Sequence, residues 1–429
     1  MPVNREKIQN LLERLRDHIP LESASERLLP KFSSAKPRLR HVKSLDEANI
    51  KSNWELLKTH TDLSNDDQHL ISDPFSLDHI EDYSNSIENC IGTLKLPVGV
   101  AGPLRVNGLF AQGDYYLPLA TTEAALVASY SRGARVITEA GGCSALILND
   151  GISRSPGFIF ANLIEASQFL LWTHDQFEQF KKIAESTTNH GKLIDTRTTM
   201  EGNHVYLNFD YNTGDASGQN MATIATAAIL QFITDNTPIK PRHAFVEANL
   251  SGDKKASALS FLSVRGKKVT AEVLLEKALV ERYLHTTPET MAEYWRLAAL
   301  GGVMSGTMGV QAHYANGLAA LYLATGQDVA CISESSVGIT RMELTDEGKL
   351  YAAVTLPNIV VGTVGGGTKL PSQAVGLKLL GLTGKEQVHA FAEVCAACCL
   401  AGELSIMGAM CAGDFASAHQ RLARGKTKP

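Results

Sequence analysis

Lysine, carboxylate and histidine side chains that could stabilise charge or transfer a proton occur at Glu123, Asp253-Lys254-Lys255, Asp328 and His419. A fixed cation in a dry site stabilises negative charge on a former carbonyl oxygen far better than water does. The neighbouring residues alone favour simpler interpretations. They are typical of a solvated turn at residues 253–255 and an exposed loop residue at 328. Glu123 would be favoured at a helix start by the helix dipole, and His419 would be an ordinary surface histidine. The residue types therefore permit this chemistry without assigning it.

Two glycine-rich loops could face an anionic group. Gly214–Asn220 lies between an expected strand and an expected helix, so backbone N–H groups and a helix N-terminus would be available to a phosphate. No G-x-G-x-x-G sequence follows a strand, and Gly362–Gly367 lacks the Gly-Lys-Ser/Thr end of a P-loop. A nucleotide-binding fold in this chain should therefore be unrelated to both.

The elements that must position these segments follow from hydrophobic periodicity. The expected helices are 1–16, 124–137, 168–186, 221–235, 290–300 and 305–325, and the expected strands include 204–211, 245–250 and 269–275. Asn107-Gly108 is a hairpin signal, and the hydroxyls of Thr121 and Thr122 should cap the helix at 124–137. The pattern predicts an α+β protein, with a small helical N-terminal domain (1–88), a large mixed α/β domain (89–154 and 246–429) and an inserted small α+β domain (155–245).

Composition places the chain among ordinary globular proteins of more than one domain. Of its 429 residues, 44% are hydrophobic and 20% are charged, and the net charge of −5 does not indicate nucleic acid as a partner. We find no apolar run of the roughly 18 residues that span a bilayer and no signal-peptide centre in Met1–Arg16. We therefore expect a cytoplasmic protein without a membrane partner.

The cysteine pattern could suggest zinc or redox chemistry. Cys395, Cys398 and Cys399 form a CxxC in an apolar run, but no histidine stands at ligand spacing. Packed helix cysteines are the better interpretation. We predict no metal and no disulfide.

One long string is not explained by composition: Glu88-Asn89-Cys90-Ile91-Gly92, followed by PVGVAGPL at 97–104. It resembles a signature of the 3-hydroxy-3-methylglutaryl-CoA (HMG-CoA) reductases of the biosynthetic class. Further strings follow in that family's order: Thr121-Thr122-Glu123, DASGQNM at 215–221, Asp253-Lys254-Lys255, Gly326-Gln327-Asp328, GTVGGGT at 362–368 and Ala418-His419. The resemblance covers about residues 85–424, and although each string alone is weak, their number and order are specific.

The resemblance implies a four-electron, NAD(P)H-dependent reduction of HMG-CoA to mevalonate and CoA. It assigns Lys254 as the cation for the developing oxyanion and Asp328 as the carboxylate that keeps Lys254 charged. Glu123 would donate a proton to the aldehyde oxygen with a pKa raised by burial, and His419 would protonate the CoA thiolate. Asn316 would hydrogen-bond the cluster of Lys254 and Asp328.

The same resemblance implies the binding residues. The substrate-binding residues would be Ser129, Arg154, Asp253, Lys255, Arg296 and Asn316, with Arg296 in place of a usual lysine. The cofactor-binding residues would be Thr188, Asn189, Asp215, Ser217, Gly218, Gln219, Asn220, Gly365 and Gly366, all in or beside the inserted domain or the second glycine-rich loop. Ser217 and Gln219 replace methionines that are usual in the class, so packing around the nicotinamide should differ.

The cofactor specificity stays open at this point. Thr188-Asn189 stand where the class reads the 2′-phosphate of NADPH with Ser-Arg, and Asn189 could instead bind the free 2′-hydroxyl of NADH. His190, Lys192 and Arg197 are near enough in sequence to supply another cation. We favour NADPH, with NADH as the alternative, and the resemblance implies a dimer or tetramer with a shared active site. NAD-linked mevalonate oxidation and a catalytically silent acyl-CoA-binding protein remain alternative functions.

Overall fold

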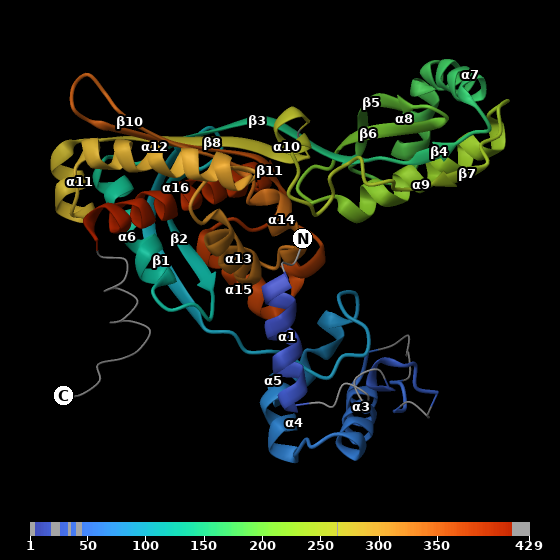
Figure 1. Cartoon of the computed structure of the whole chain (residues 1–429), viewed down its shortest axis with the longest axis horizontal. Coiled ribbons are helices and arrows are strands. Elements are labelled where there is room, and N and C mark those ends of the chain that lie inside the picture. The colour runs from blue at the N-terminus through green and yellow to red at the C-terminus, as the bar shows by residue number, and fades with distance from the viewer. Residues whose placement is uncertain (1–4, 19–25, 33–35, 40–44, 264, 414–429) are drawn as a thin grey trace. The chain divides into compact units, whose positions relative to one another are not determined.

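The computed structural model describes residues 5–18, 26–32, 36–39, 45–263 and 265–413 (Figure 1). The chain divides into two compact units. One consists of Met1–Ile80 and Glu88–Thr93, and the other of Glu81–Ile87 and Leu94–Pro429. The three-part division inferred from the sequence stays a proposal.

The first unit is helical in its described residues. Its helices are α1 (Arg5–His18), α3 (Glu47–His60), α4 (Asn65–Ile71) and α5 (Pro74–Asp78), and the 3-10 turn η1 (Ile80–Tyr83) follows. Trp54 of α3 is buried and donates its indole N–H to the carbonyl of Ile91 at 2.8 Å. The backbone N–H of Thr93 donates to Ile71 at 2.8 Å. These bonds tie the later segment Glu88–Thr93 back onto the helices of this unit.

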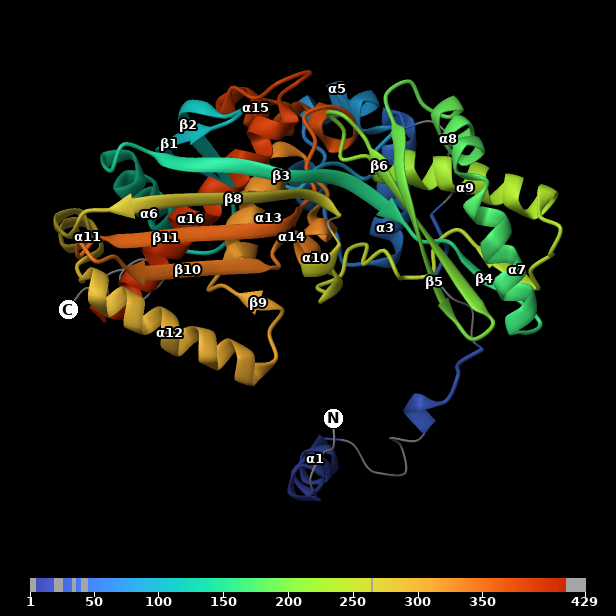
Figure 2. The ribbon, with the colours of Figure 1, turned by 90° about the horizontal axis from the view of Figure 1, so that it is seen from above.

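The second unit contains a mixed sheet. Its strands are β1 (Val98–Gly108), β2 (Gln112–Ala120), β3 (Cys143–Arg154), β4 (Gly157–Ile159), β5 (Lys192–Glu201), β6 (His204–Asn212), β7 (His243–Phe245), β8 (Gly266–Leu275), β9 (Gly309–Val310), β10 (Gly338–Leu344) and β11 (Leu350–Ile359). The main strand order is β7-β4-β6-β3-β8-β11-β10-β9. Strand β3 pairs first with β8 and then, over Ile152–Arg154, with β6 (Figure 2). One strand therefore runs through both parts of the sheet and carries Arg154 at its end.

Helices pack on this sheet. They are α6 (Leu126–Glu139), α7 (Leu163–His174), α8 (Phe177–Ser186), α9 (Gln219–Asn236), α10 (Leu259–Leu262), α11 (Lys277–Leu284), α12 (Pro288–Ser305), α13 (Tyr314–Thr325), α14 (Ile332–Ser335), α15 (Pro371–Leu380) and α16 (Val388–Ala412), with the 3-10 turns η2 (Val329–Cys331) and η3 (Gly366–Lys369). Helix α16 lies against β3, β8 and β11, and α12 lies against β10 (Figure 2). This arrangement confirms the predicted α+β class.

Three predicted elements differ from the structure. The expected helix 168–186 is two helices, α7 and α8, and only His243–Phe245 of the region around 245–250 forms a strand. The expected helix 305–325 begins only at Tyr314, because α12 ends at Gly306 in the left-handed region (φ 74°) and Gly309 also has a positive φ of 92°. Glycines adopt this conformation without steric cost, so they end a helix that apolar periodicity alone would continue.

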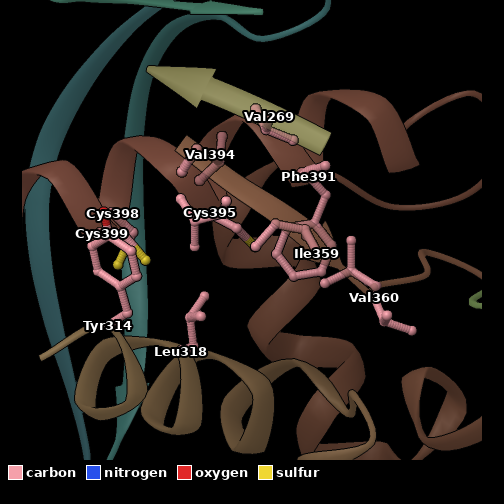
Figure 3. Close-up of a cluster of buried hydrophobic side chains, with 14 of the residues drawn as sticks. Val269, Tyr314, Leu318, Ile359, Val360, Phe391, Val394, Cys395, Cys398 and Cys399 are labelled. Carbon is pink, nitrogen blue, oxygen red and sulfur yellow. The ribbon is translucent and has the colours of Figure 1, made fainter. Parts of the chain in front are cut away.

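The core is built around α16 (Figure 3). Tyr314 and Leu318 of α13 pack against one side of α16, and sheet residues such as Val269 pack against the other. A side chain at Gly133 of α6 would place Cβ only 1.8 Å from the carbonyl oxygen of Ala401, so the two helices cross at backbone contact. Close crossing of this kind leaves little room for larger residues.

Cys395, Cys398 and Cys399 are buried in α16, which confirms that they are packed helix cysteines. Burial raises the pKa of the Cys398 thiol to about 12, so it stays protonated and unreactive.

Within the described ranges, α16 is also long and apolar enough to cross a membrane. This corrects the expectation that no segment reaches that length, since the apolar run continues past Glu393 and Glu403. In the structure, 83% of its most apolar window is buried inside the protein.

Glu393 of α16 fixes the turn between β1 and β2. Its fully buried carboxylate accepts the backbone N–H groups of Leu109 at 3.1 Å, Phe110 at 2.9 Å and Ala111 at 2.7 Å. We expect Glu393→Ala to lower the free energy of unfolding by roughly 3 kcal/mol, because the substitution strands these donors. Glu393→Gln keeps an acceptor oxygen and should cost less. Urea denaturation measures both variants, and equal losses would contradict this assignment.

Candidate active site

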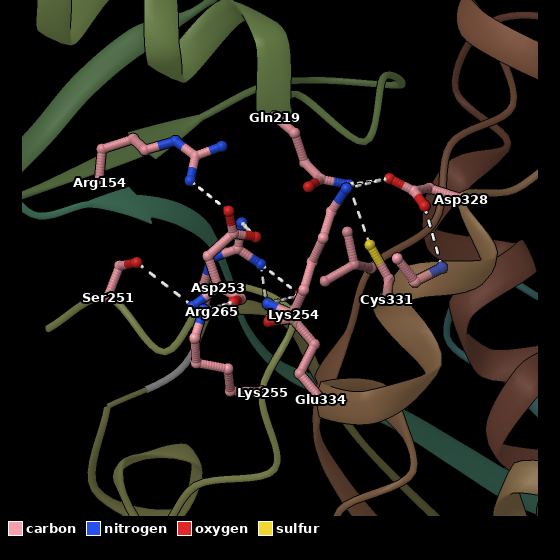
Figure 4. Close-up of polar contacts among 12 residues, drawn as sticks. Arg154, Gln219, Ser251, Asp253, Lys254, Lys255, Arg265, Asp328, Cys331 and Glu334 are labelled. Atoms are coloured by element: carbon pink, nitrogen blue, oxygen red, sulfur yellow. Dashed lines mark hydrogen bonds and ion pairs between the residues drawn. The ribbon is translucent and has the colours of Figure 1, made fainter. Parts of the chain in front are cut away.

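Lys254 and Asp328 form the centre of a charged cluster (Figure 4). The Nζ atom of Lys254 lies 2.7 Å from Oδ2 of Asp328, and the two side chains are 39% and 40% exposed. The hydrogen bond to Asp328 raises the pKa of Lys254. The lysine therefore stays an ammonium ion at neutral pH while its end remains accessible to a substrate.

The loop that carries Lys254 has an unusual backbone. Lys254 lies in the left-handed region with φ 55°, which non-glycine residues rarely adopt, and its N–H donates to Oε1 of Glu334 at 3.1 Å. Such a conformation persists when the surroundings hold it. Glu334 therefore fixes the backbone from which the lysine projects.

Arg265 links Glu334 to this loop, and sequence reasoning missed both residues. Arg265 is 1% exposed, its Nη1 lies 2.6 Å from both oxygens of Glu334, and its Nη2 lies 2.6 Å from Oδ1 of Asp253. Burial raises the pKa of Glu334, and Arg265 offsets part of that rise. The only signal in the sequence was an arginine at the start of an apolar strand, which ordinarily indicates a solvated strand end.

Arg154 joins the same cluster from the end of β3. Its guanidinium pairs with Asp253 and lies 3.6 Å from Glu247, and its Nε donates to Thr223 at 2.9 Å. Burial alone would raise the pKa of Asp253, but the two guanidinium groups lower it overall. The structure thus brings Arg154 and Asp253 together with Lys254 and Asp328, of which the resemblance implied only the pairing of Lys254 with Asp328.

Glu123 and Asn316 form a separate pair. The amide of Asn316 donates to Oε2 of Glu123 at 2.7 Å, whereas the sequence placed Asn316 in the cluster around Lys254. In the single chain Asn316 lies away from that cluster, because it is in the first turn of α13 and Asp328 follows the last turn. A helix rises about 1.5 Å per residue, so the two positions are separated by roughly 14 Å along the axis.

The local structure at Glu123 also differs from the prediction. Thr121 accepts the N–H of Glu123 at 3.0 Å, and α6 begins only after Ala125, whose φ is 72° and whose side chain makes no cap. The predicted hydroxyl cap is therefore wrong, and Glu123 lies in a turn before the helix. Its side chain is exposed in the single chain.

Ser129, Lys255 and Arg296 have other contacts. The hydroxyl of Ser129 lies 2.9 Å from that of Ser405, between α6 and α16. Lys255 donates to the carbonyl of Asp253 at 2.8 Å, and Arg296 pairs with Glu293 on the exposed face of α12. Ser129 and Arg296 are thus placed on elements that do not carry Lys254.

The two predicted cofactor loops lie side by side. Gly218 is the N-cap residue directly before α9, with φ 78° and no side-chain cap, which leaves the first N–H groups of the helix without a side-chain acceptor. A Cβ at Gly362 would lie 2.7 Å from the backbone nitrogen of Ser217, so the loop that continues to Gly365 and Gly366 rests on the loop before α9, while Asn220 is exposed in its first turn. These backbone groups could hold the phosphates of a dinucleotide.

Asp215 forms hydrogen bonds that hold neighbouring loops together. Its carboxylate accepts the N–H groups of Glu386 at 2.8 Å and Val388 at 3.4 Å, and its carbonyl accepts Thr363 at 2.9 Å. It therefore joins the loop before α9 to the start of α16. Any role at the cofactor would be added to this one.

Thr188 and Asn189 form the turn between α8 and β5. The Thr188 hydroxyl accepts the N–H groups of His190 and Gly191, both at 3.2 Å, and the side chain of Asn189 is exposed. Arg197, a candidate substitute cation, is held by both oxygens of Asp210 at 3.0 Å. His419 lies outside the described residues.

A charged lysine held by a carboxylate can stabilise an oxyanion, and the backbone groups at the start of α9 could bind a dinucleotide, so the site suits an enzyme that reduces a carbonyl group with a nicotinamide cofactor. The family model for hydroxymethylglutaryl-coenzyme A reductase matches residues 49–424. The chain is 44% identical over 357 residues to the 3-hydroxy-3-methylglutaryl-coenzyme A reductase of Methanocaldococcus jannaschii, covering 82% of this chain and 87% of that protein. It is also 44% identical over 362 residues to the reductase of Haloferax volcanii, covering 81% and 89%. The chain therefore belongs to the hydroxymethylglutaryl-coenzyme A reductase family.

A solved structure has the same fold. The class II reductase of Streptococcus pneumoniae, bound to NADPH in open conformations, superimposes with a TM-score of 0.63. The match covers 84% of this chain and 96% of that one at 19% identity.

Proposed function

We propose that the protein is an HMG-CoA reductase of the biosynthetic class, which converts HMG-CoA to mevalonate and CoA with NADPH in preference to NADH. The contact of 2.7 Å between Lys254 and Asp328, in a chain of this family, is the observation that carries the proposal. The motif strings that end with Ala418-His419 favour the biosynthetic class. A cytoplasmic location and a nucleotide-binding role for residues 155–245 are part of the proposal.

The proposed roles follow from the charges of the side chains. A bound nicotinamide dinucleotide would supply one hydride in each of two reductions. The Lys254 ammonium stabilises the negative charge that both reductions place on the former carbonyl oxygen. His419 protonates the departing thiolate after the first reduction, and Glu123 gives a proton to the alkoxide of the second. Arg154 binds the substrate carboxylate.

Turnover distinguishes this proposal from the alternatives. Purified protein mixed with HMG-CoA and NADPH should release free CoA thiol, and omitting the cofactor should stop the release. A silent acyl-CoA-binding protein would bind ligand without releasing thiol. An enzyme specialised for mevalonate oxidation would require NAD⁺, CoA and mevalonate and would reduce HMG-CoA poorly.

We also propose that the active site is shared between two subunits of a dimer or tetramer. Glu123 and Lys254 lie near opposite ends of α13, and Glu123 is exposed although its role requires burial. A second copy would bring the two ends together and cover Glu123. Exposed apolar residues on one helix, α12, favour such an interface: Leu297 (69%), Leu300 (64%), Val303 (73%) and Met304 (88%).

Mixed oligomers test the shared site. Glu123→Gln and Lys254→Ala should each be inactive alone, but subunits mixed in equal amounts should recover roughly a quarter of wild-type activity, because half of the dimers are mixed and each has one intact site. The measurement is the rate of HMG-CoA reduction after co-refolding. Activity no higher than that of the parents would place both residues in one chain's site.

Asn189 should set the cofactor preference. The wild type should discriminate weakly between NADPH and NADH, and Asn189→Arg should raise its preference for NADPH by about 1.5–3 kcal/mol, because arginine binds phosphate with charge-assisted hydrogen bonds. The ratio of kcat/KM for the two cofactors measures this change. A wild-type preference above roughly a thousandfold, about 4 kcal/mol, would show that Asn189 is not the discriminating residue.

A further inference from the structure

Gln219 connects α9, the helix beside the proposed cofactor loops, to the charged cluster around Lys254 and Asp328 (Figure 4). It is the first residue of α9, its side chain is 8% exposed, and its amide nitrogen donates to Oδ2 of Asp328 at 3.4 Å and to Sγ of Cys331 at 3.0 Å. Oδ2 is also the oxygen that contacts Lys254 at 2.7 Å. The amide of Gln219 and the lysine therefore meet at one atom.

The carboxylate of Asp328 is held from three directions. The backbone N–H of Ala330 donates to Oδ1 at 3.0 Å, while Gln219 and Lys254 contact Oδ2. An amide donates without adding charge, so Gln219 orients the carboxylate and leaves its attraction for the ammonium intact. Burial of Gln219 makes this donor hard to replace with water.

We propose that Gln219 is a positioning residue, whose amide orients Asp328 and thereby sets where the Lys254 ammonium stands. The inference rests on the proposed function. Gln219 belongs to the first turn of α9, whose N–H groups are the proposed cofactor phosphate site. The same helical turn thus positions both the cofactor and the carboxylate that holds the catalytic cation.

Two substitutions separate the donor from the shape of the side chain. Gln219→Met has similar volume and no donor, and it restores the residue that is usual in the class, so it should fold. Its kcat should nevertheless fall about tenfold at every pH, the effect of one lost hydrogen bond, because in this chain Asp328 is oriented by the Gln219 amide. Gln219→Glu has the same shape, but it donates only when protonated. Its ionised form would repel Asp328, and this repulsion raises the pKa of the new carboxyl toward neutrality.

The kcat of Gln219→Glu, divided by that of wild type, should therefore be low at pH 8 and rise at least about fivefold by pH 6, as the carboxyl becomes a donor. The groups that face this position are Asp328, Cys331 and, through Asp328, Lys254. The pKa of Cys331 is raised by burial to about 12, so its thiol does not titrate in this range. The KM of the uncharged variant Gln219→Met for NADPH should change by less than about twofold, since backbone groups are the proposed contacts.

Gln231→Glu is the matched control. Gln231 lies on the same helix and donates to both oxygens of Asp235 at 3.0 Å, but on the exposed surface. Its kcat and pH profile should equal those of wild type.

A flat ratio of Gln219→Glu to wild type, or a Gln219→Met kcat within twofold of wild type, would overturn the proposal. A Gln219→Met protein that fails to fold leaves the pH test on Gln219→Glu decisive. An inactive wild type would instead refute the proposed function.

Discussion

Lys254→Ala should abolish both reductions while the protein remains folded. Each reduction builds charge on the same oxygen, and removing the cation should raise both barriers by roughly 3 kcal/mol or more, above a hundredfold in kcat. The side chain is 39% exposed and its partner Asp328 remains solvated, so stability should change little. The measurement is kcat with HMG-CoA and, separately, with mevaldehyde.

Lys277→Ala is the control for this variant. Lys277 pairs with Glu281 and Glu289 on the surface, and its removal should leave both rates unchanged. Near-normal kcat of Lys254→Ala with mevaldehyde would show that Lys254 is not the oxyanion cation.

Arg265→Met should be the most destabilising single substitution in the site. Glu334 is fully buried and would lose its cationic partner, which costs about 3–5 kcal/mol of the free energy of unfolding. The loop of Asp253 and Lys254 would also lose one of its anchors, the contact of Arg265 with Asp253, so kcat should fall in any protein that still folds. Urea denaturation gives the stability, and steady-state kinetics give the rate.

The interaction between Arg265 and Glu334 can be tested by removing both charges. Adding Glu334→Gln to Arg265→Met should restore part of the lost stability, because no uncompensated charge then remains buried. A double variant that loses the sum of both single losses would show that the two residues do not interact.

Local patterns predicted the elements whose burial alternates along the chain. Strand β6 and helix α9 appear almost at their predicted bounds, because each buries one regular set of apolar residues. The buried cysteines of α16 followed from their apolar surroundings in the same way. The contact of Lys254 with Asp328 depended on resemblance to a family, since nothing in either segment's local pattern places them together.

Contacts between distant segments could not be predicted. Arg265 and Glu334 are 69 positions apart, and a buried ion pair looks like two ordinary surface residues in sequence. Asn316 contacts Glu123 because α13 places it a full helix length from Asp328. Predicting this contact would have required knowing where the helix starts. The start of α13 depends on Gly306 and Gly309, whose positive φ angles interrupt the helix that the apolar spacing predicted.

The most direct test of the account is the stoichiometry of the reaction. In a reaction of purified protein with limiting HMG-CoA and excess NADPH, two equivalents of NADPH should be oxidised for each mevalonate formed and each CoA thiol released. This ratio follows if one site, with Lys254 as its cation, carries out both reductions. One equivalent of NADPH per thiol, with mevaldehyde accumulating, or thiol release without NADPH oxidation, would contradict it.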